Sequence, residues 1–385
     1  MLLFAIIDIL LYCLFAVSVI YLTLFSVAAL FFRKKEVPVP SVFNRIAIFI
    51  PAYKEDRVIF DTVGTCLKQN YPQDKYDIVV IADRMSDDTL SKLRELPVIL
   101  VEMPEEENTK AKALNRALDT VHDYDIAVVL DADNLCSQGF LSTINGMYES
   151  GYKAIQAHRK AKNIEKPFAL LDAVSEEINN TIFRKGHVAL GFSSALIGSG
   201  MAFDYRWFKN RMKSVCTAGE DKEIETFLLQ DRIKIIYLPD EIVLDEKVCR
   251  ADAFYQQRRR WLSAQFYHML SLFPELFRAI RTRNKDMVNK VIQTVVLPRV
   301  LLLGLLFFIS LSLSFFIIEI AIKWWVLLGI LVCSLLLAMP REFFGKHLIK
   351  ALIKLPVAFV LMFANLFRIK GGNKKFVATE HGNRQ

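Results

Sequence analysis

Hydrophobic and polar positions follow three different patterns along the chain. Residues 2–32 are almost wholly apolar, and the basic stretch Arg33-Lys34-Lys35 follows them. Residues 45–245 instead carry short runs rich in valine and isoleucine, which alternate with segments of helical periodicity. Beyond residue 290, long apolar runs return. Short apolar strands between helices are typical of α/β domains, and long apolar runs are typical of membrane helices. We therefore predict an α/β domain flanked by membrane segments.

The central region, residues 36–250, predicts one sheet with its ligand-binding residues at one edge. The predicted strands are Ile46–Ile50, Tyr76–Ala82, Val98–Val101 and Ile126–Leu130, and the predicted helices are Asp56–Gln69, Asp87–Glu95 and Thr109–Val121. This alternation predicts a parallel sheet with right-handed crossovers. Ligands of such sheets bind at the carboxyl ends of the strands, and Asp83 and Asp131 each follow a predicted strand.

Residues 1–35 predict a retained transmembrane helix. Their apolar stretch exceeds the ~20 residues that cross a hydrocarbon core of ~30 Å. A cleaved signal peptide has a basic start and a shorter apolar run, and this sequence has neither. Because lysine and arginine flank the cytoplasmic ends of membrane helices, Arg33-Lys34-Lys35 predict a cytoplasmic location for the domain that follows.

Residues 251–340 predict an interfacial helix and a hairpin. Apolar residues at helical spacing and many arginines indicate an amphipathic helix in the headgroup layer over residues 251–290. Within residues 291–340, Val291–Ile318 and Trp324–Met339 predict two transmembrane helices joined by a turn at Lys323.

Residues 341–385 predict an interfacial helix and a cytoplasmic C-terminal loop. The apolar run Pro356–Phe367 is short, and basic residues flank it on both sides. Positive charge at both ends disfavours a crossing. We expect three crossings in total, although the sequence leaves open whether Pro356–Phe367 spans the membrane.

Composition narrows the class of partner. The chain is 53% hydrophobic and 23% charged, and its mean hydropathy is +0.29, between the values of soluble domains and membrane bundles. The net charge is +8, and the lysines and arginines cluster beside the apolar runs, where they can bind anionic lipid headgroups. A basic stripe with interleaved aromatics is missing, so we predict no nucleic-acid partner. The six cysteines form no CxxC pair and predict free thiols in a reducing compartment.

Four polar motifs follow one another along the chain. They are Asp83, Asp131-Ala132-Asp133, Glu220-Asp221 and Gln257-Arg258-Arg259-Arg260-Trp261. Alternation along an extended segment puts both carboxylates of the second motif on one side, where they suit a hard divalent cation. Each motif has a plainer interpretation. Asp83 suits a helix cap, the second motif a solvated turn, the third an acidic helix start and the fourth a basic cluster at a lipid surface.

The ordered set resembles the membrane-integrated family-2 glycosyltransferases, which include cellulose, chitin and hyaluronan synthases and ceramide glucosyltransferase. The resemblance spans roughly residues 45 to 380. It implies a cytoplasmic GT-A (Rossmann-like) domain that carries a sugar from a UDP-sugar to a glycan or lipid-linked acceptor with inversion, giving a β linkage. It also implies Mg²⁺ or Mn²⁺ at Asp133 and Asp131, and Asp221 as the catalytic base beside Glu220.

The same resemblance assigns the substrate-binding residues. They are Ala52, Tyr53, Glu55, Asp83, Lys112, Asp131, Gly198, Ser199, Gly200, Gln257, Arg260, Trp261, Thr379 and His381. Arg260 has the forked guanidinium that suits diphosphate oxygens, and Trp261 offers a flat face to a sugar ring. Two positions depart from the family pattern: Lys54 replaces an asparagine, and Ala111 stands where a glycine is usual before the lysine.

Other functions remain open at this stage. Within the class, a non-processive enzyme that glycosylates a ceramide-like lipid is the alternative to a polysaccharide synthase. Outside it, a membrane-anchored nucleotidyltransferase also uses a nucleotide-binding α/β domain with aspartate-bound metal, but has no need of the fourth motif. A membrane scaffold or transporter is a third alternative. The sequence does not give the sugar, the acceptor, the linkage position, the processivity or the state of self-association.

Overall fold

The computed structural model describes residues 2–104, 109–215, 217, 219–249 and 251–366. Thr379 and His381 lie outside the described residues. The chain divides into two compact units. We call the described residues within 34–164 and 193–248 the sheet unit, and those within 2–33, 165–192 and 249–366 the helical unit. Residues 165–192, which we expected within the 36–250 domain, therefore belong to the helical unit.

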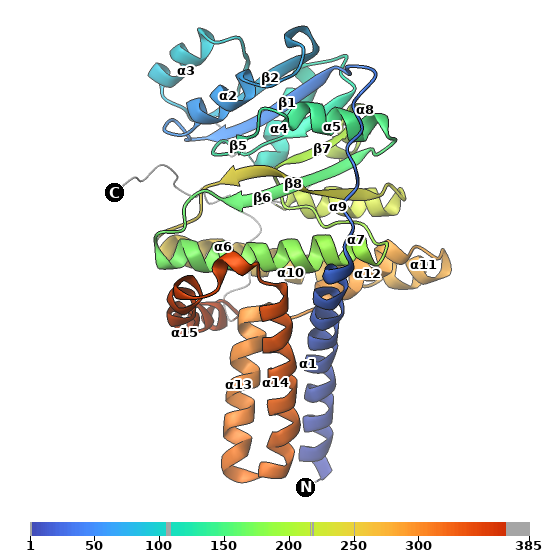
Figure 1. Cartoon of the computed structure of the whole chain (residues 1–385), viewed down its shortest axis with the longest axis vertical. Helices are drawn as coiled ribbons and strands as arrows, with labels where there is room; N and C mark the ends of the chain where they lie inside the picture. Colours follow the sequence, from blue (N-terminus) through green and yellow to red (C-terminus); the bar gives the residue numbers. More distant parts are fainter. Residues whose placement is uncertain (1, 105–108, 216, 218, 250, 367–385) are drawn as a thin grey trace. The chain divides into compact units, whose positions relative to one another are not determined.

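The sheet unit contains one eight-stranded sheet, with strand order β3-β2-β1-β4-β7-β6-β8-β5 (Figure 1). The strands are β1 (Ile46–Tyr53), β2 (Tyr76–Asp83), β3 (Ile99–Glu102), β4 (Ile126–Val129), β5 (Leu135–Cys136), β6 (Ala154–Ala161), β7 (Met201–Asp204) and β8 (Ile235–Asp245). The helices are α2 (Ile59–Leu67), α3 (Asp87–Arg94), α4 (Lys110–Thr120), α5 (Phe140–Glu149), α8 (Tyr205–Met212) and α9 (Glu220–Gln230), with a 3₁₀ turn at Gln73–Lys75.

The sheet is mixed: the four strands that we predicted are parallel as expected, whereas the later strands are not all parallel. Strands β1, β2, β3 and β4 are parallel, whereas β7 runs antiparallel to both of its neighbours, β4 and β6. Because β6 pairs in parallel with β8, the reversal at β7 leaves β4, β6 and β8 running in the same direction. The carboxyl ends of these strands and the amino end of β7 therefore meet at one edge, which is where the candidate site forms.

The core explains why the first strands were predictable. Strand β1 is almost wholly buried, as expected for a strand covered on both faces. Its residues Ile48 and Ile50 pack in one hydrophobic cluster with Val80 of β2 and Val128 of β4. The ends of β6 and β8 are more polar, with Arg159 and Asp245 among their residues. Periodicity alone therefore did not reveal these two strands.

Helices α3 and α4 start at side-chain caps. The hydroxyl of Ser86 accepts a hydrogen bond from the backbone N–H of Thr89, and the hydroxyl of Thr109 accepts one from that of Lys112. Such caps satisfy backbone donors that a helix start leaves unpaired. The plainer interpretation of Asp83 was a helix cap. Since Ser86 caps α3, Asp83 does not have that role.

The helical unit is built from long helices. They are α1 (Leu2–Ala28), α6 (Pro167–Asn179), the π-helix η3 (Asn180–Gly186), α7 (His187–Ala189), α10 (Ala251–Leu272), α11 (Glu275–Arg281), α12 (Lys285–Val295), α13 (Arg299–Phe316), α14 (Ile318–Ala338) and α15 (Lys346–Leu366), with 3₁₀ turns at Ala29–Phe31 and Arg341–Phe343. Gly186 allows η3 to touch α1, because a Cβ atom at this position would lie 2.2 Å from the carbonyl oxygen of Phe25.

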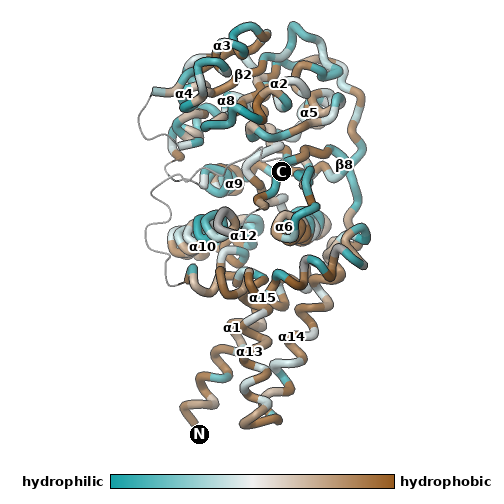
Figure 2. Tube along the Cα trace, turned by 90° about the vertical axis from the view of Figure 1, so that its left-hand side faces the viewer, coloured by the Kyte–Doolittle hydropathy of each residue, from teal (hydrophilic) through white to brown (hydrophobic). Residues whose placement is uncertain are grey.

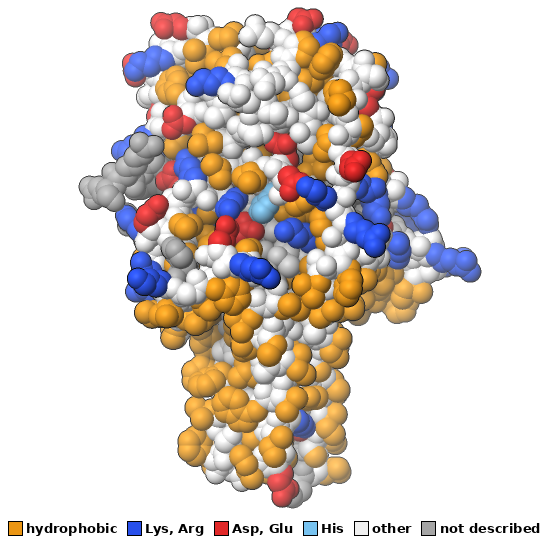
Figure 3. Space-filling model, viewed as in Figure 1, with side chains coloured by type: hydrophobic (Ala, Val, Ile, Leu, Met, Phe, Trp, Pro, Cys, Tyr) orange, Lys and Arg blue, Asp and Glu red, His pale blue; other side chains and the backbone are white. Residues whose placement is uncertain are grey.

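Within the part of the chain that the structure describes, four helices are long and apolar enough to cross a membrane: Leu2–Phe31, Arg299–Phe316, Ile318–Ala338 and Leu348–Leu366. The first three lie side by side, and hydrophobic residues cover their length (Figures 2 and 3). The fourth, α15, runs across the end of this bundle in both ribbon views rather than along it (Figures 1 and 2). Length and composition alone do not separate a crossing from an interfacial helix, so the three-crossing topology stays a prediction.

The hairpin has different boundaries from those we predicted. The predicted helix Val291–Ile318 is divided at Pro298, which follows α12 and precedes α13, because proline cannot supply the N–H of a continuous helix. The turn between α13 and α14 is at Ile317 rather than at Lys323. Lys323 lies inside α14, where its ammonium group pairs with Asp8 of α1.

Candidate functional site

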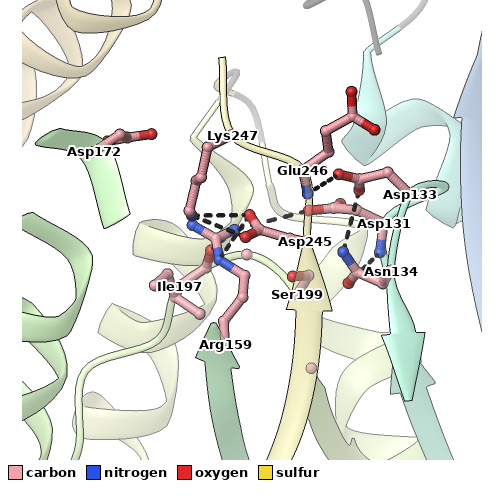
Figure 4. Close-up of polar contacts among 12 residues, drawn as sticks. Asp131, Asp133, Asn134, Arg159, Asp172, Ile197, Ser199, Asp245, Glu246 and Lys247 are labelled. Atoms are coloured by element: carbon pink, nitrogen blue, oxygen red, sulfur yellow. Dashed lines mark hydrogen bonds and ion pairs between the residues drawn. The ribbon is translucent and has the colours of Figure 1, made fainter. Parts of the chain in front are cut away.

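The candidate site lies at the sheet edge where β4, β6 and β8 end. Asp131-Ala132-Asp133 follows β4, Arg159 belongs to the end of β6, and Asp245 ends β8 (Figure 4). These three strands run in the same direction, so their last residues come together although Asp131 and Asp245 are 114 residues apart in sequence. The order and direction of the strands in the sheet therefore bring these residues together.

Asp131 and Asp133 have separate partners. The segment is a turn, closed by a hydrogen bond of 3.1 Å from the backbone N–H of Asn134 to the carbonyl of Asp131. The extended geometry that we expected here is therefore wrong. Asp133 is buried, and its two oxygens accept hydrogen bonds from the N–H of Glu246 at 2.7 Å and the amide of Asn134 at 3.1 Å (Figure 4).

Lys110 joins three parts of the site. Its ammonium donates to Asp131 Oδ1 at 2.6 Å and to the carbonyl of Gly198 at 2.7 Å, and it lies 3.3 Å from Glu220 Oε1. Burial opposes the charged form, but Asp131 and Glu220 outweigh it and hold the pKa of Lys110 above its ordinary value. Lys110 is therefore charged at neutral pH and balances both carboxylates.

Lys112, the lysine that the sequence singled out, is exposed and lies outside this cluster. Counting along the family pattern points to Lys110 instead. In the family pattern the lysine stands three residues before the alanine of Ala-Leu-Asn, and three residues before Ala113 is Lys110. Thr109 then occupies the place of the usual glycine, and Ala111 is no departure from the pattern.

Glu220 and Asp221 occupy the first turn of α9. The acidic helix start and the proximity of Asp221 to the turn at Gly198 are both observed, so the two interpretations of this motif are compatible. Burial raises the pKa of Glu220, and the negative charge of Asp221 acts in the same direction, while Lys110 opposes them. Asp221 lies beside Gly198, whose positive φ of +90° favours glycine.

Two residues of β6 escaped the sequence analysis. Gln156 is fully buried, and its amide nitrogen donates to the carbonyl oxygens of Ser199 at 3.0 Å and Gly200 at 3.3 Å. Arg159 donates to the carbonyl of Ile197 at 3.2 Å. The available signal was Gln156 itself, a polar residue within the apolar part of β6 and just before its polar end. A buried side-chain amide nearly always has hydrogen-bond partners, so such a residue indicates a specific contact.

The β1 and β2 ends form a second part of the edge. Tyr53 is the register partner of Asp83, and the backbone N–H of Lys54 donates to the carbonyl of Asp83 at 3.0 Å. Ala52 is buried, while the N–H of Glu55 points at the sulfur of Met85 at 3.2 Å. Lys54 has a φ of +56°, a conformation that asparagine adopts more readily, so the family's asparagine fits this position physically.

Gln257, Arg260 and Trp261 belong to α10 of the helical unit. The neighbouring Arg258 pairs with Asp172, and its guanidinium lies 4.4 Å from the ring centre of Trp261. The expectation that Arg258 contacts lipid is therefore not met, because its partners are protein groups. The guanidinium of Arg258 covers one face of the Trp261 ring, so only the opposite face could stack against a sugar.

The carboxylates suit a metal that arrives with a phosphate ligand. Among the residues that the structure describes, no three His, Cys, Asp or Glu side chains are grouped to hold a metal ion. Mg²⁺ is commonly bound by one or two carboxylates and completes its shell with water and phosphate oxygens. Asp131 and Asp133 meet that requirement in the type and number of their donors.

Comparison with known proteins agrees with this geometry. The sequence model of the family described as "Glycosyltransferase like family 2" matches residues 44–264, more than half of the chain. Among solved structures, the mannosyltransferase PcManGT of Pyrobaculum calidifontis, determined with GDP-Man and Mn²⁺, superposes with a TM-score of 0.52 at 18% identity. The match covers 88% of this chain and 99% of that one, and it shows the GT-A-like fold.

Two curated relatives are more similar in sequence. A β-monoglucosyldiacylglycerol synthase of Trichormus variabilis is 24% identical over 268 residues, and the match covers 66% of this chain and 56% of the length of that protein. A probable glycosyltransferase of Bacillus subtilis, YdaM, is 29% identical over 257 residues, covering 62% of this chain and 59% of its own. The chain thus spans little more than half the length of the curated relatives it matches.

Proposed function

The chain belongs to the glycosyltransferase family 2-like proteins, and from this premise we propose that it transfers a sugar from a UDP-sugar to a membrane lipid or lipid-linked acceptor, with inversion. The observation that carries the proposal is the cluster at the sheet edge. Lys110 links Asp131, on the expected donor side, to Glu220 and to the turn at Gly198. The family match over residues 44–264 favours sugar transfer over a nucleotidyltransferase or a scaffold.

The chain's own groups divide the work between donor and acceptor. Asp83 and the β1 end would hold the nucleoside. Asp221 would accept the proton of the acceptor hydroxyl as its oxygen attacks the anomeric carbon, and the bond from that carbon to the diphosphate would break. Asp133 and Asp131 would hold Mg²⁺ or Mn²⁺, which when bound stabilises negative charge on the leaving diphosphate. Lys110, already charged, would add to that stabilisation.

A lipid acceptor is favoured over a growing polysaccharide. Among the described residues, the helical unit has four apolar helices of sufficient length, of which α1, α13 and α14 lie side by side and α15 runs across their end. Three crossings provide little wall for a polymer channel. The named relative from Trichormus variabilis also makes a glycosylated diacylglycerol. Gln257, Arg260 and Trp261 keep their predicted binding roles as part of this proposal, as does the cytoplasmic location of the sheet unit.

The test is a transfer assay with purified full-length chain in nanodiscs. A panel of UDP- and GDP-sugars is supplied with Mn²⁺, once with diacylglycerol and once with a soluble oligosaccharide. The proposal expects a product of one or two sugars on the lipid, with a β-anomeric signal by NMR. Long polymer would identify a polysaccharide synthase instead, and an α-anomeric product would remove the inverting mechanism.

A further inference from the structure

Two side chains of strand β6 form hydrogen bonds with the backbone N–H and C=O groups of Ile197. The Oε1 atom of Gln156 accepts a hydrogen bond of 3.0 Å from the N–H of Ile197, and Nη1 of Arg159 donates one of 3.2 Å to its carbonyl. The amide nitrogen of Gln156 also donates to the carbonyl oxygens of Ser199 and Gly200. Side chains of β6 thus hold backbone groups of Ile197, Ser199 and Gly200 within residues 197–200, which we call the 197–200 turn.

Arg159 is itself held by a buried ionic chain. Its Nε lies 3.4 Å from Oδ2 of Asp245, and the ammonium of Lys247 donates to the same carboxylate at 3.0 Å (Figure 4). The side chains of Arg159 and Asp245 are 11% exposed, and that of Lys247 is 3% exposed. Buried ion pairs add little stability compared with apolar residues of the same size. This chain of charges is therefore better explained by the orientation it gives to Arg159.

The 197–200 turn is the neighbour of Asp221 and Lys110. A Cβ atom on Gly198 would lie 3.7 Å from Oδ2 of Asp221, and the carbonyl of Gly198 accepts from Lys110 at 2.7 Å. A shift of the turn therefore changes the space in front of Asp221 and the position of the ammonium group. A displacement of about 1 Å near reacting groups can cost about 10²-fold in rate.

We propose that Gln156 and Arg159 are positioning residues for sugar transfer, which hold the 197–200 turn at the distance from Asp221 that an acceptor hydroxyl requires. They act on the acceptor side, through the Ile197 peptide, and do not touch the donor. This inference rests on the proposed function, because it needs Asp221 to act on the acceptor.

One neighbouring contact offers a rival role. Nη1 of Arg159 also lies 3.9 Å from Oδ2 of Asp131, on the expected donor side. If Arg159 served mainly to orient Asp131, its loss would weaken binding of UDP in the presence of Mn²⁺. The two roles are therefore separable by measuring donor binding and acceptor use independently.

The experiment compares Arg159→Lys and Gln156→Glu with the wild type, using the full-length chain in nanodiscs. Lysine keeps the charge but lacks the fork that reaches both Ile197 and Asp245. Glutamate still accepts from the N–H of Ile197 but cannot donate to the turn. Arg211→Lys is the control for the exchange of arginine by lysine, since Arg211 of α8 pairs with Asp231, which follows α9, in a more exposed ion pair. Turnover of acceptor, UDP binding with Mn²⁺, melting temperature and the share of donor lost to water are measured.

Both variants are expected to lower acceptor turnover by about 10- to 100-fold, to bind UDP as the wild type does and to lose a larger share of donor to water. The control is expected to change none of these. Wild-type turnover of acceptor in Arg159→Lys, or a loss of UDP binding that accounts for the lower turnover, would overturn the inference. A wild type that transfers no sugar would instead count against the proposed function.

Discussion

Gly198 leaves open the space beside the carboxylate of Asp221. The two residues come from different elements, the turn before β7 and the first turn of α9, yet a Cβ atom on Gly198 would lie 3.7 Å from Oδ2 of Asp221. Any larger side chain there would compete with a ligand for that carboxylate, and the φ of +90° strains every residue other than glycine. This pairing is the structural reason for assigning the acceptor side to Asp221.

Replacing Asp221 by asparagine should therefore separate chemistry from donor binding. Asparagine has the same size but cannot take a proton, and loss of a general base costs about 10²–10⁴-fold in rate. We expect turnover to fall by that factor while affinity for UDP with Mn²⁺ stays unchanged. The measurement is a UDP titration by calorimetry beside a transfer assay at saturating donor.

Asp133→Ala provides the opposite signature and serves as the control. Asp133 is predicted to hold the metal and the diphosphate, so this variant should lose both UDP binding in Mn²⁺ and transfer. Should Asp221→Asn bind UDP poorly but turn over normally at saturating donor, the base would have to be sought elsewhere, with Glu220 the next candidate.

The two lysines of α4 form a matched pair for a second prediction. Lys110 contacts Asp131 and Glu220, whereas Lys112 is exposed and two residues further along the same helix. We expect Lys110→Gln to lower turnover by about 10²-fold, the usual cost of removing one charged group from such a site. Lys112→Gln should remain close to the wild type. A transfer assay on the two variants checks this, and equal losses would return the donor role to Lys112.

How far the sequence could go is visible in the sheet. Strands β1, β2, β3 and β4 were predicted to within three residues at each end, because each is a short apolar run, and β1, β2 and β4 are almost wholly buried. Strands β6 and β8 end in polar residues that serve the site, such as Arg159 and Asp245, and such ends have no hydrophobic periodicity. The reversal at β7 depends on pairing between distant segments, which periodicity does not contain.

The site divides in the same way. Acidic residues at strand ends, such as Asp83 and Asp131, could be proposed because a parallel sheet places them at one edge. The partner of Asp133 is the backbone N–H of Glu246, and that of Ile197 is Arg159. Contacts of this kind join residues through backbone groups, which have the same chemistry at every position. They become visible only when the fold is known.

The buried carboxyl of Glu220 predicts a pH effect on stability. Burial raises its pKa above the ordinary value of 4.5, so the folded state binds more protons than the unfolded state in the range just above that value. The contribution of Glu220 to the free energy of unfolding is therefore fully present below about pH 4.5 and is lost as pH rises through the raised pKa. Glu220→Gln removes this loss. We expect the melting temperature of the variant, relative to the wild type, to be higher at pH 7.5 than at pH 4.5 in calorimetric scans.

The opposite trend would have a specific meaning. If the variant became relatively less stable as pH rose, the attraction between Glu220 and Lys110, which are 3.3 Å apart, would dominate over the cost of burial. Turnover per folded molecule, measured in the same samples, separates this effect from catalysis, because a change in stability alone leaves that turnover unchanged.

The last prediction decides whether α15 crosses the membrane. Its two halves contact helices of the same unit: the ammonium of Lys354 lies 5.8 Å from the ring centre of Phe168 in α6, and the amide of Asn365 donates to the carbonyl of Tyr255 in α10 at 3.3 Å. Helix α10 carries three consecutive arginines, which are costly to place inside a hydrocarbon core. A helix tied to α6 and α10 along its length is therefore expected to lie at the interface.

Cysteines introduced singly at Lys35, Lys346 and Gln385, in a background whose six native cysteines are replaced by serine, should then behave alike. We expect a membrane-impermeant maleimide to label none of the three in intact cells and all of them after the membrane is opened, because positive residues hold these ends in the cytoplasm. Labelling of position 385 from outside, with position 346 still protected, would show that α15 crosses. Four crossings would then separate the C-terminal loop from the sheet unit, and the predicted roles of Thr379 and His381 in donor binding would have to be abandoned.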